Sequence, residues 1–359
     1  MTDTSPAVTA VVAARNEEGY IEACVRSLLA QQSPIGGFEV IVAEGMSEDA
    51  TRSILERLAK EDSRLTVIDN PDQITPAAFN VAIRQARGRY IAFMSAHARY
   101  PEDYLVRCFE LAERLAADNV GGPAIAEGHG FLQRAIAASH HSPFSVGGAS
   151  WHSLEYEGKA STVFGGFYRR DVFNRIGMFD ENLVRNQDDE LNFRLELAGG
   201  VIWQSPSVRS WYTPRSTLNG LFRQYRQYGY WKVRVLLKHG RTPSLRHYVP
   251  ATFVLALASD FLLVLLAYLG TLAAPHSSWT VAIEWLAAIF AVAPISYLVV
   301  LATASVTTAA RSGWDLLLVL PAVFATYHLA YGIGFLQGLI DFGLRRRVVP
   351  PAGMSQITR

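Results

Sequence analysis

The sequence predicts an α/β domain, with a mostly parallel sheet flanked by helices, followed by a helical membrane region. Up to about residue 240, short apolar runs alternate with charged, helix-like stretches, as strands and crossover helices do in parallel sheets. Beyond that point three apolar segments, 251–273, 281–304 and 316–340, are long enough to cross a bilayer. We therefore expect two domains, 1–240 and 241–359.

Composition and charge narrow the classes of function. The chain has 359 residues and a formal net charge of +1, which gives no support for nucleic-acid binding, so no nucleic acid is expected as a partner. Its two cysteines, Cys24 and Cys108, form neither a disulfide framework nor a metal-finger spacing, and we expect both to be reduced core residues. Residues 1–8 lack a basic region leading into an apolar core. We therefore expect no cleavable signal peptide and a cytoplasmic first domain.

Four short apolar runs are predicted to be buried strands, namely 7–14, 38–43, 65–68 and 90–94. Helices are expected between them, from about residue 21, over 52–60 and over 76–86, and another begins near Pro101. Because these strands run parallel, their carboxyl ends share one edge of the sheet. Open α/β sheets bind their ligands at that edge.

Polar loops follow three of these strands. Residues 15–18 (Arg-Asn-Glu-Glu) follow the first strand, 44–51 the second, and Ser95-Ala96-His97 the fourth. A carboxylate such as Glu44 can accept hydrogen bonds from base N–H groups or ribose hydroxyls, and Ser47 can cap the next helix. The alternative for the second loop is that its polar residues only form a turn and a cap.

Two further motifs lie between residues 163 and 195. Residues 163–170 are predicted to be a strand that contains a glycine pair, Gly165-Gly166, with a helix from about Asp171. Residues 187–190 (Gln-Asp-Asp-Glu) begin a helix, where the helix dipole favours carboxylates. A solvated helix start is the alternative reading of these three carboxylates. His140 and His141 precede these two motifs in the chain, and we expect them to be loop residues without a role.

Residues 218–240 are predicted to form an aromatic and basic helix. Gln224, Gln227 and Trp231 fall on one face of it, and Arg223 or Arg226 can supply a positive charge that meets a diphosphate. The alternative is an amphipathic helix on the membrane surface, with its basic residues toward lipid headgroups. Both roles can hold together.

Flanking charges give a membrane topology with one conflict. Arg241, Arg246 and His247 precede the first span and Arg311 follows the second, which favours the cytoplasm for both positions, and the uncharged loop 273–279 is expected outside. Residues 345–347 (Arg-Arg-Arg) would then also lie outside. Either one segment does not cross fully, or the first domain dominates the orientation. The ionisable residues within the spans are hypotheses for function or packing; they are Asp260, Glu284 and His328.

Taken together, these motifs resemble family 2 glycosyltransferases of the GT-A fold. Residues 44–51 are similar to the family's D-G-x-S-x-D-x-T loop, and 187–194 to its E-D-x-x-L-x-x-R motif. Ser95-Ala96-His97 stands at the D-x-D position, with both aspartates replaced. The Tyr-Pro that follows, the Asn-Gln-Asp-Asp-Glu-Leu run and the Tyr-Gly-x-Trp-Lys helix resemble succinoglycan-type exopolysaccharide glycosyltransferases.

The resemblance implies an inverting transfer of a sugar from a nucleotide diphosphate sugar, with a UDP-sugar expected. The implied acceptor is a polyprenyl-diphosphate-linked or other membrane-associated glycan at the cytoplasmic face of the cell membrane, and Asp188 stands where the catalytic base lies. The implied donor contacts are Ala14, Arg15, Asn16, Glu17, Glu44, Ser47, Asn80, Ser95 and Ala96. Residues implied on the acceptor and diphosphate side are Gly165, Gly166, Gln187, Asp189, Arg223, Arg226, Gln227 and Trp231. Asn80 has an equal alternative as a polar residue on an exposed helix face.

The resemblance also implies a divalent metal, Mn²⁺ or Mg²⁺, that neutralises the departing diphosphate. His97 would bind this metal, or would pair with phosphate as an imidazolium, while Ser95 would be limited to a hydrogen bond on ribose or phosphate. Tyr230 replaces the Arg of the Q-x-x-R-W motif, which argues against a polymer-extruding synthase.

Two other classes of function remain in view. A nucleotidyltransferase would need a Gly-rich loop after the first strand, where residues 15–18 stand instead. A degenerate, non-catalytic glycosyltransferase homologue, acting as a nucleotide- or lipid-binding partner subunit, is the stronger alternative because of Ser95 and Tyr230.

Overall fold

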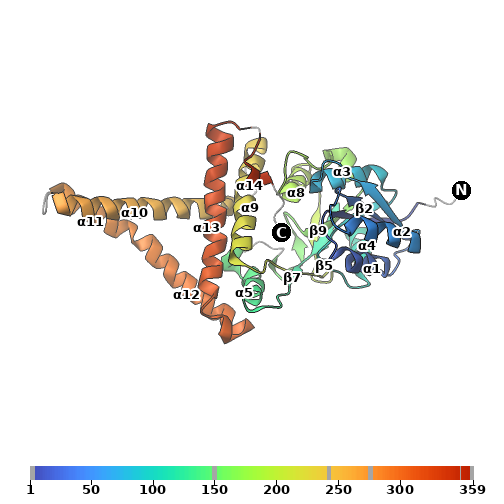
Figure 1. Cartoon of the computed structure of the whole chain (residues 1–359), viewed down its shortest axis with the longest axis horizontal. Helices are drawn as coiled ribbons and strands as arrows, with labels where there is room; N and C mark the ends of the chain where they lie inside the picture. Colours follow the sequence, from blue (N-terminus) through green and yellow to red (C-terminus); the bar gives the residue numbers. More distant parts are fainter. Residues whose placement is uncertain (1–4, 148–151, 241–243, 274–277, 348, 356–359) are drawn as a thin grey trace. The chain divides into compact units, whose positions relative to one another are not determined.

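The computed structural model describes residues 5–147, 152–240, 244–273, 278–347 and 349–355. These form two compact units, Met1–Glu127 with Gly148–Pro214, and Gly128–Gly147 with Arg215–Arg359. The first unit contains the sheets and the second is helical (Figure 1). The predicted boundary at residue 240 differs from this division, because residues 128–147 and 215–240 pack with the C-terminal helices.

An eight-stranded sheet forms the centre of the first unit, in the order β3-β2-β1-β4-β9-β6-β10-β8. Neighbours among β1 to β4 are parallel, whereas β9 is antiparallel to both β4 and β6. The strands are Val8–Ala14 (β1), Phe38–Glu44 (β2), Leu65–Asp69 (β3), Tyr90–Ser95 (β4), Asn119–Gly122 (β6), Gly158–Lys159 (β8), Phe164–Arg169 (β9) and Ile202–Gln204 (β10). The mostly parallel sheet predicted from the sequence is confirmed.

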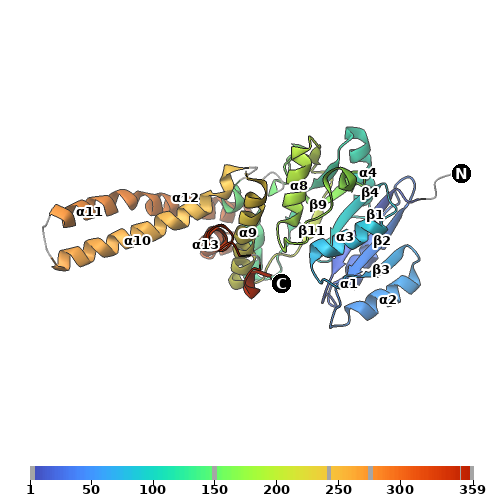
Figure 2. The same ribbon diagram turned by 90° about the horizontal axis from the view of Figure 1, so that it is seen from above.

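Helices cover both faces of this sheet, so its central strands are buried on both sides (Figure 2). Val8, Ala10 and Val12 of β1 pack with helices on one face, and Val11 packs with helices on the other. Burial on two faces explains why β1 is apolar throughout instead of alternating. The helices are α1 (Ile21–Leu29), α2 (Thr51–Glu61) and α4 (Tyr104–Leu115) on the first face, and α3 (Thr75–Gln85), α7 (Val172–Ile176) and α8 (Gln187–Leu197) on the second.

The long apolar runs predicted the strands well, and the short strands were missed. The four runs correspond to β1 to β4 with ends shifted by one residue at most. The small sheet β5-β11-β7 was not predicted, because two- and three-residue strands show no periodicity. Its strands are Ala98–Arg99 (β5), Ser210–Tyr212 (β11) and Ala124–Ala126 (β7). β5 follows the Ser95–His97 segment directly and so fixes where that segment ends.

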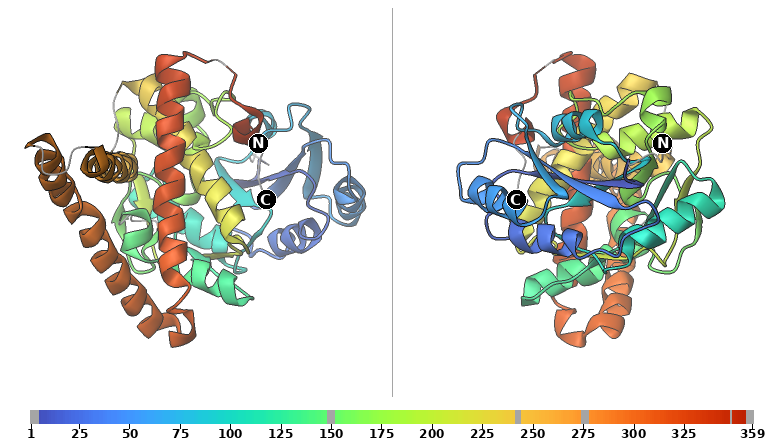
Figure 3. Two further views of the ribbon diagram at one scale, coloured as in Figure 1. Left: turned by 60° about the vertical axis from the view of Figure 1, so that its left-hand side comes forward. Right: turned by 90° about the vertical axis from the view of Figure 1, so that its right-hand side faces the viewer.

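Two long helices of the second unit, α9 (Leu218–His239) and α13 (Leu320–Gly338), lie side by side (Figures 1 and 3). The hydroxyl of Thr217 caps α9 by accepting a hydrogen bond from the Gly220 amide at 3.0 Å. Glycines allow the two helices to approach closely. A Cβ added at Gly334 would lie 1.9 Å from the Arg226 carbonyl oxygen, and one at Gly229 would lie 2.1 Å from the Tyr331 carbonyl oxygen.

Three helical segments of the described chain are long and apolar enough to cross a membrane. They span Leu245–Ala273, Val281–Ser312 and Leu320–Leu344, and they confirm the three predicted apolar helices. The third begins at Leu320 instead of residue 316, because a 3₁₀ turn, η3 (Trp314–Leu316), precedes it. The helices are α10 (Val249–Ala273), α11 (Ser278–Phe290), α12 (Val292–Ser312), and α13 extended by the π-helical turn η4 (Leu339–Leu344). Arg241 and residues 274–277, on which part of the predicted topology depends, lie outside the described residues.

Two predictions about histidines have different outcomes. His328 packs inside the second unit, with Nε2 2.7 Å from the Phe144 carbonyl oxygen and Nδ1 3.0 Å from the Tyr297 hydroxyl, so the packing alternative is confirmed for it. His140 is not a loop residue. It ends helix α5 (Phe131–His140) and is buried, because the small residues before it are helical.

Candidate active site

The carboxyl ends of β1, β2 and β4 meet at one edge of the sheet. Ala14 of β1 pairs with Glu44 of β2, and Ala13 pairs with Ser95 of β4. β1 thus lies between β2 and β4, at the point where the strand order reverses and where open α/β sheets bind ligands. The three polar loops predicted as the donor site therefore leave the sheet next to one another.

Hydrogen bonds join the first two loops. The Asn16 amide donates to Ser47 Oγ at 2.9 Å, and the Glu48 amide donates to Asn16 Oδ1 at 2.9 Å. The Glu17 amide donates to Thr51 Oγ1 at 2.6 Å. Ser47 was predicted to cap the next helix, but α2 begins after Ala50 and Ser47 instead holds the first loop. The polar residues of the two loops thus fix each other's backbone.

Glu44 is almost fully buried, with 1% of its surface exposed. Its Oε1 accepts the Ser47 amide at 2.8 Å and its Oε2 accepts Arg52 Nη1 at 3.1 Å. The long side chain folds back onto its own loop, and its predicted contact with uracil or ribose stays a prediction. In this structure Glu44 positions the loop.

The segment at the D-x-D position is fixed through its backbone. The Ser95 amide donates to the Tyr100 hydroxyl at 2.8 Å, and Ser95 Oγ accepts the His97 amide at 3.3 Å. Beneath it, Cys24 Sγ lies 3.6 Å from the Ser95 carbonyl oxygen. Burial raises the pKa of the Cys24 thiol to about 12. Ser95 thus offers a hydroxyl at the first D-x-D position, where the family's motif has a carboxylate.

His97 and Glu17 come together from two different loops. His97 Nδ1 lies 3.2 Å from Glu17 Oε2, and Glu17 is buried while the His97 side chain is 37% exposed. The ring of Tyr20 stands edge-on to His97 at 6.0 Å between centroids. The sequence placed Glu17 among the donor contacts and gave no sign that it would lie against His97.

The pair offers a metal one carboxylate oxygen and one imidazole nitrogen. Mn²⁺ and Mg²⁺ at phosphate-transfer sites take one or two protein carboxylates, with substrate phosphates and waters as the other ligands, and imidazole is a ligand for several divalent metals. Among the described residues no cluster of three or more His, Cys, Asp or Glu side chains could hold a metal ion. The two side chains are of the types that such a cation accepts, and its remaining ligands would have to come from substrate and water.

Helix α8 presents the predicted catalytic carboxylate. It begins after Asn186, whose φ of +60° turns the chain into the helix, and Asp188 is exposed in its first turn. Beneath Asp188, Tyr168 is buried. Burial raises the pKa of the Tyr168 hydroxyl, and the charge of Asp188 raises it further. Because its side chain is exposed, Asp188 is accessible to a substrate hydroxyl.

The three consecutive carboxylates of α8 differ in their surroundings. Glu190 is buried and accepts hydrogen bonds from Arg194, which also donates to the Met178 carbonyl oxygen at 2.7 Å. The alternative of a solvated helix start is wrong for Glu190, because the helix turns it into the protein. Asp188 and Asp189 retain partial or full exposure.

A buried polar network that the sequence did not reveal supports this helix. Asn192 Oδ1 accepts hydrogen bonds from the Tyr168 hydroxyl at 2.8 Å and from Asn119 Nδ2 at 2.9 Å, and Asn192 Nδ2 donates to Thr162 Oγ1 at 2.9 Å. Buried amides need such partners, since an unpaired polar group is costly. The network joins α8 to β9 and β6. No motif links these positions in the sequence, so only the fold brings them together.

The glycine pair of β9 has the positive φ angles that favour glycine, +71° at Gly165 and +93° at Gly166. A Cβ at Gly165 would lie 2.8 Å from the Phe93 carbonyl oxygen in β4. The predicted close backbone approach is therefore found. Its predicted role on the acceptor side stays a prediction.

Asn80 is buried, which contradicts one of its two predicted roles. Its Nδ2 donates to the Phe179 carbonyl oxygen at 2.9 Å and to Glu181 Oε1 at 2.7 Å, and its Oδ1 accepts the Phe179 amide at 3.0 Å. The exposed-face alternative is wrong, and the amide is already used to hold the 179–181 loop. Its predicted contact with the donor stays a prediction.

The residues predicted on α9 belong to the second unit. Gln227 Nε2 donates to the Gly353 carbonyl oxygen at 3.1 Å, and Trp231 Nε1 donates to the Met354 carbonyl oxygen at 2.8 Å. Their side chains therefore hold the short C-terminal helix α14 (Ala352–Ser355). Their predicted contact with the acceptor stays a prediction. Arg226 donates to Gln337 Oε1 at 2.6 Å, and Arg223 is exposed.

Comparisons with known proteins agree with this arrangement. The sequence model described as glycosyl transferase family 2 matches residues 9–177. The succinoglycan biosynthesis protein ExoA of Rhizobium meliloti is 33% identical over 96% of this chain and 98% of its own length. The dolichyl N-acetyl-alpha-D-glucosaminyl phosphate 3-beta-D-2,3-diacetamido-2,3-dideoxy-beta-D-glucuronosyltransferase of Methanococcus voltae is 24% identical over 62% of this chain and 71% of its own length.

A solved structure supports the fold. The mannosyltransferase PcManGT of Pyrobaculum calidifontis, solved with GDP-Man and Mn²⁺, superposes with a TM-score of 0.56 at 18% identity, covering 92% of this chain and 87% of its own. The sheet with an antiparallel strand between β4 and β6, together with the close relative over nearly the whole length, confirms the fold and the enzyme class predicted. The chain belongs to glycosyltransferase family 2.

Proposed function

We propose that the chain catalyses an inverting transfer of a sugar from a nucleotide diphosphate sugar, with UDP as the expected nucleotide, to a lipid-linked glycan acceptor. The observation that carries the proposal is the meeting of Glu17 and His97, 3.2 Å apart, at the carboxyl ends of β1 and β4. This edge is where a nucleotide fits an open α/β sheet. The pair offers polar side chains to the diphosphate beside Ser95, which stands where the family's motif has an aspartate.

Asp188 is the proposed catalytic base. Its carboxylate is exposed at the start of α8, and a carboxylate in this position can take the proton from the acceptor hydroxyl as that oxygen attacks the anomeric carbon. The bond from the anomeric carbon to the diphosphate oxygen then breaks on the opposite face, which inverts the centre. The buried network of Asn192 and Tyr168 holds the helix that carries Asp188.

Glu17 and His97 are the residues that would hold a divalent cation, with Mn²⁺ favoured over Mg²⁺ because one ligand is an imidazole. When bound, the cation supplies Lewis-acid stabilisation of the departing diphosphate. Ser95 Oγ already accepts the His97 amide, so its role is to order the segment, and a hydrogen bond to ribose or phosphate is the further role proposed for it.

A membrane-bound acceptor is supported by two independent features. In the described part of the chain three helices are long and apolar enough to cross a membrane, and the name of the Methanococcus voltae relative specifies a dolichyl-phosphate-linked sugar. Succinoglycan biosynthesis by the Rhizobium meliloti relative favours an exopolysaccharide product. We place the protein in the cell membrane as a multi-pass protein, with its catalytic unit on the cytoplasmic side.

The test uses the full-length chain in detergent with a panel of nucleotide sugars, a polyprenyl-diphosphate-linked acceptor, and Mn²⁺, Mg²⁺ or a chelator. We expect acceptor-dependent release of nucleoside diphosphate, and a fall of about 10²–10⁴-fold in kcat for Asp188→Asn, the range for loss of a general base. Glu196→Gln, an exposed carboxylate at the other end of α8, is the matched control. Release that survives in Asp188→Asn would overturn the base assignment.

The second candidate is a degenerate homologue that binds a nucleotide or lipid for a partner subunit. It is favoured by the replacement of both D-x-D aspartates by Ser95 and His97. Nucleotide binding with no release from any donor, by a chain that remains folded, would support it against catalysis.

A further inference from the structure

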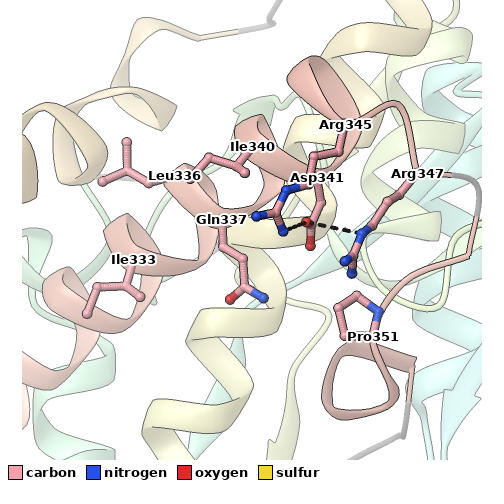
Figure 4. Close-up of a pocket in the computed structure, with 8 residues that line it drawn as sticks. All are labelled: Ile333, Leu336, Gln337, Ile340, Asp341, Arg345, Arg347 and Pro351. Atoms are coloured by element: carbon pink, nitrogen blue, oxygen red, sulfur yellow. Dashed lines mark hydrogen bonds and ion pairs between the residues drawn. The ribbon is translucent and has the colours of Figure 1, made fainter.

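A pocket of about 380 Å³ lies in the second unit, at the end of α13 (Figure 4). Most of its lining comes from α13 and the π-helical turn η4, and the rest from the segment that follows. The lining residues are Ile333, Leu336, Gln337, Ile340, Asp341, Arg345, Arg347 and Pro351. None of these residues has a place in the catalytic proposal above.

Two guanidinium groups share one carboxylate in this pocket. Arg345 Nη1 and Arg347 Nε lie 3.5 and 3.6 Å from the same oxygen of Asp341, as the dashed lines in Figure 4 mark. The other oxygen of Asp341 accepts the Tyr230 hydroxyl at 3.3 Å. Two positive charges against one negative charge leave an excess of one positive charge. Both contacts are long for hydrogen bonds, and the two arginine side chains are 60% and 44% exposed, so N–H donors remain available to an anion.

The opposite part of the pocket is apolar. Ile333, Leu336 and Ile340 come from the candidate span Leu320–Leu344, and they lie on the left of Figure 4, away from Arg347 and Pro351. Ile333 and Ile340 are exposed. Cationic donors at the end of an apolar span, next to exposed apolar side chains, match a molecule with an anionic head and a hydrocarbon chain.

Internal hydrogen bonds hold the pocket's shape. The Arg347 amide donates to the Asp341 carbonyl oxygen at 2.8 Å, which holds Arg347 against η4. Arg226 of α9 fixes Gln337 at 2.6 Å, and Trp231 fixes the segment just after Pro351 through the Met354 carbonyl oxygen. π-Helical turns are rare in proteins, and those that occur often lie at functional sites. The arginines are therefore placed by the fold, unlike a loose basic tail.

We propose that this pocket binds the phosphate group of an anionic membrane lipid, with Arg345 and Arg347 donating to the phosphate and a hydrocarbon chain lying along Ile333, Leu336 and Ile340. The inference does not depend on the proposed sugar transfer. The phosphate can come from a bilayer phospholipid or from a polyprenyl diphosphate, because both combine a phosphate with a hydrocarbon chain.

The test is native mass spectrometry of the full-length chain in detergent, titrated with phosphatidylglycerol. We expect one tightly bound lipid, and binding about tenfold weaker in Arg345→Gln and in Arg347→Gln. Arg346→Gln is the matched control, since it removes the same charge from the same tripeptide but Arg346 does not line the pocket. Its binding should stay within about twofold of wild type. Arg347→Lys keeps the charge and should retain part of the affinity.

Equal losses in Arg346→Gln and Arg347→Gln would overturn the proposal, because they would indicate general attraction to a basic segment. Equally tight binding of glycerol 1-phosphate, which has no chain, or of diacylglycerol, which has no phosphate, would also overturn it. Polyprenyl diphosphate added to the lipid-loaded protein separates the two sources. If polyprenyl diphosphate displaces phosphatidylglycerol at a concentration below that of the phospholipid, the pocket is assigned to the polyprenyl lipid. If phosphatidylglycerol stays bound, the pocket is assigned to a bilayer phospholipid.

Discussion

The imidazole of His97 lies against the carboxylate of Glu17, with 3.2 Å between Nδ1 and Oε2. The two residues are 80 positions apart in the chain, and the pairing of β1 with β4 brings their loops together. Glu17 thus places a carboxylate where the D-x-D position, read as Ser95-Ala96-His97, has none. We propose that Glu17, a residue from another loop, compensates for this departure from the family's motif.

Glu17→Gln should weaken metal binding at this site, because the variant keeps the shape of the side chain but removes its charge. We expect the Mn²⁺ concentration for half-saturation, measured by the loss of the free Mn²⁺ EPR signal in the presence of UDP, to rise about tenfold or more, since even residues that only support a metal ligand typically contribute about 10–100-fold in affinity. Glu61→Gln, which removes an exposed carboxylate paired with Arg26 and Arg57, is the control. An unchanged Mn²⁺ titration in Glu17→Gln would contradict the assignment.

Asn192→Leu should destabilise the first unit. The substitution leaves the buried Tyr168 hydroxyl and Asn119 amide without the oxygen that accepts from both, and an unpaired buried polar group costs about 1–3 kcal/mol. We expect a loss of about 2–5 kcal/mol in the free energy of unfolding, measured by denaturant titration. Asn182→Ala, at an exposed site with local bonds to Asp180, should change it by less than about 0.5 kcal/mol. Equal stability of the two variants would show that the network contributes little.

Sequence patterns predicted the parts of the molecule whose signals are local. The run of Val8 to Ala14 and the spans were recognised from hydrophobicity alone, since burial on two faces and the bilayer both demand continuous apolar residues. The position of Asp188 at a helix start was also readable. What could not be predicted were partners across the fold, such as Glu17 with His97 or Asn80 with the 179–181 loop, because these depend on strand order and loop paths. The burial of Gln227 and Trp231 on α9 was missed for the same reason.

The Cys24 thiol should report on the segment above it. Burial raises its pKa from 9.0 to about 12, so at pH 8 the folded chain should show almost no reaction with a maleimide, whereas both cysteines should react in denaturant. The raised pKa also makes the free energy of unfolding depend on pH. The folded state holds the proton more tightly, so this contribution is complete below pH 9 and is lost as the pH rises from 9 to about 12. Rapid labelling of Cys24 in the folded chain, identified by peptide mapping, would show that the Ser95 segment opens readily.

Gly334→Ala should disturb the packing of α13 on α9. A Cβ at this position would lie 1.9 Å from the Arg226 carbonyl oxygen, and because that atom belongs to the helix backbone, the two helices must separate. Overpacking of this kind costs about 1–3 kcal/mol, so the thermal midpoint of the detergent-solubilised chain should fall by several degrees. Gly343→Ala is the control, since a Cβ there meets no atom within 4 Å. The same fall in both variants, or in neither, would indicate that the close approach of the helices at Gly334 is not what stabilises this pair.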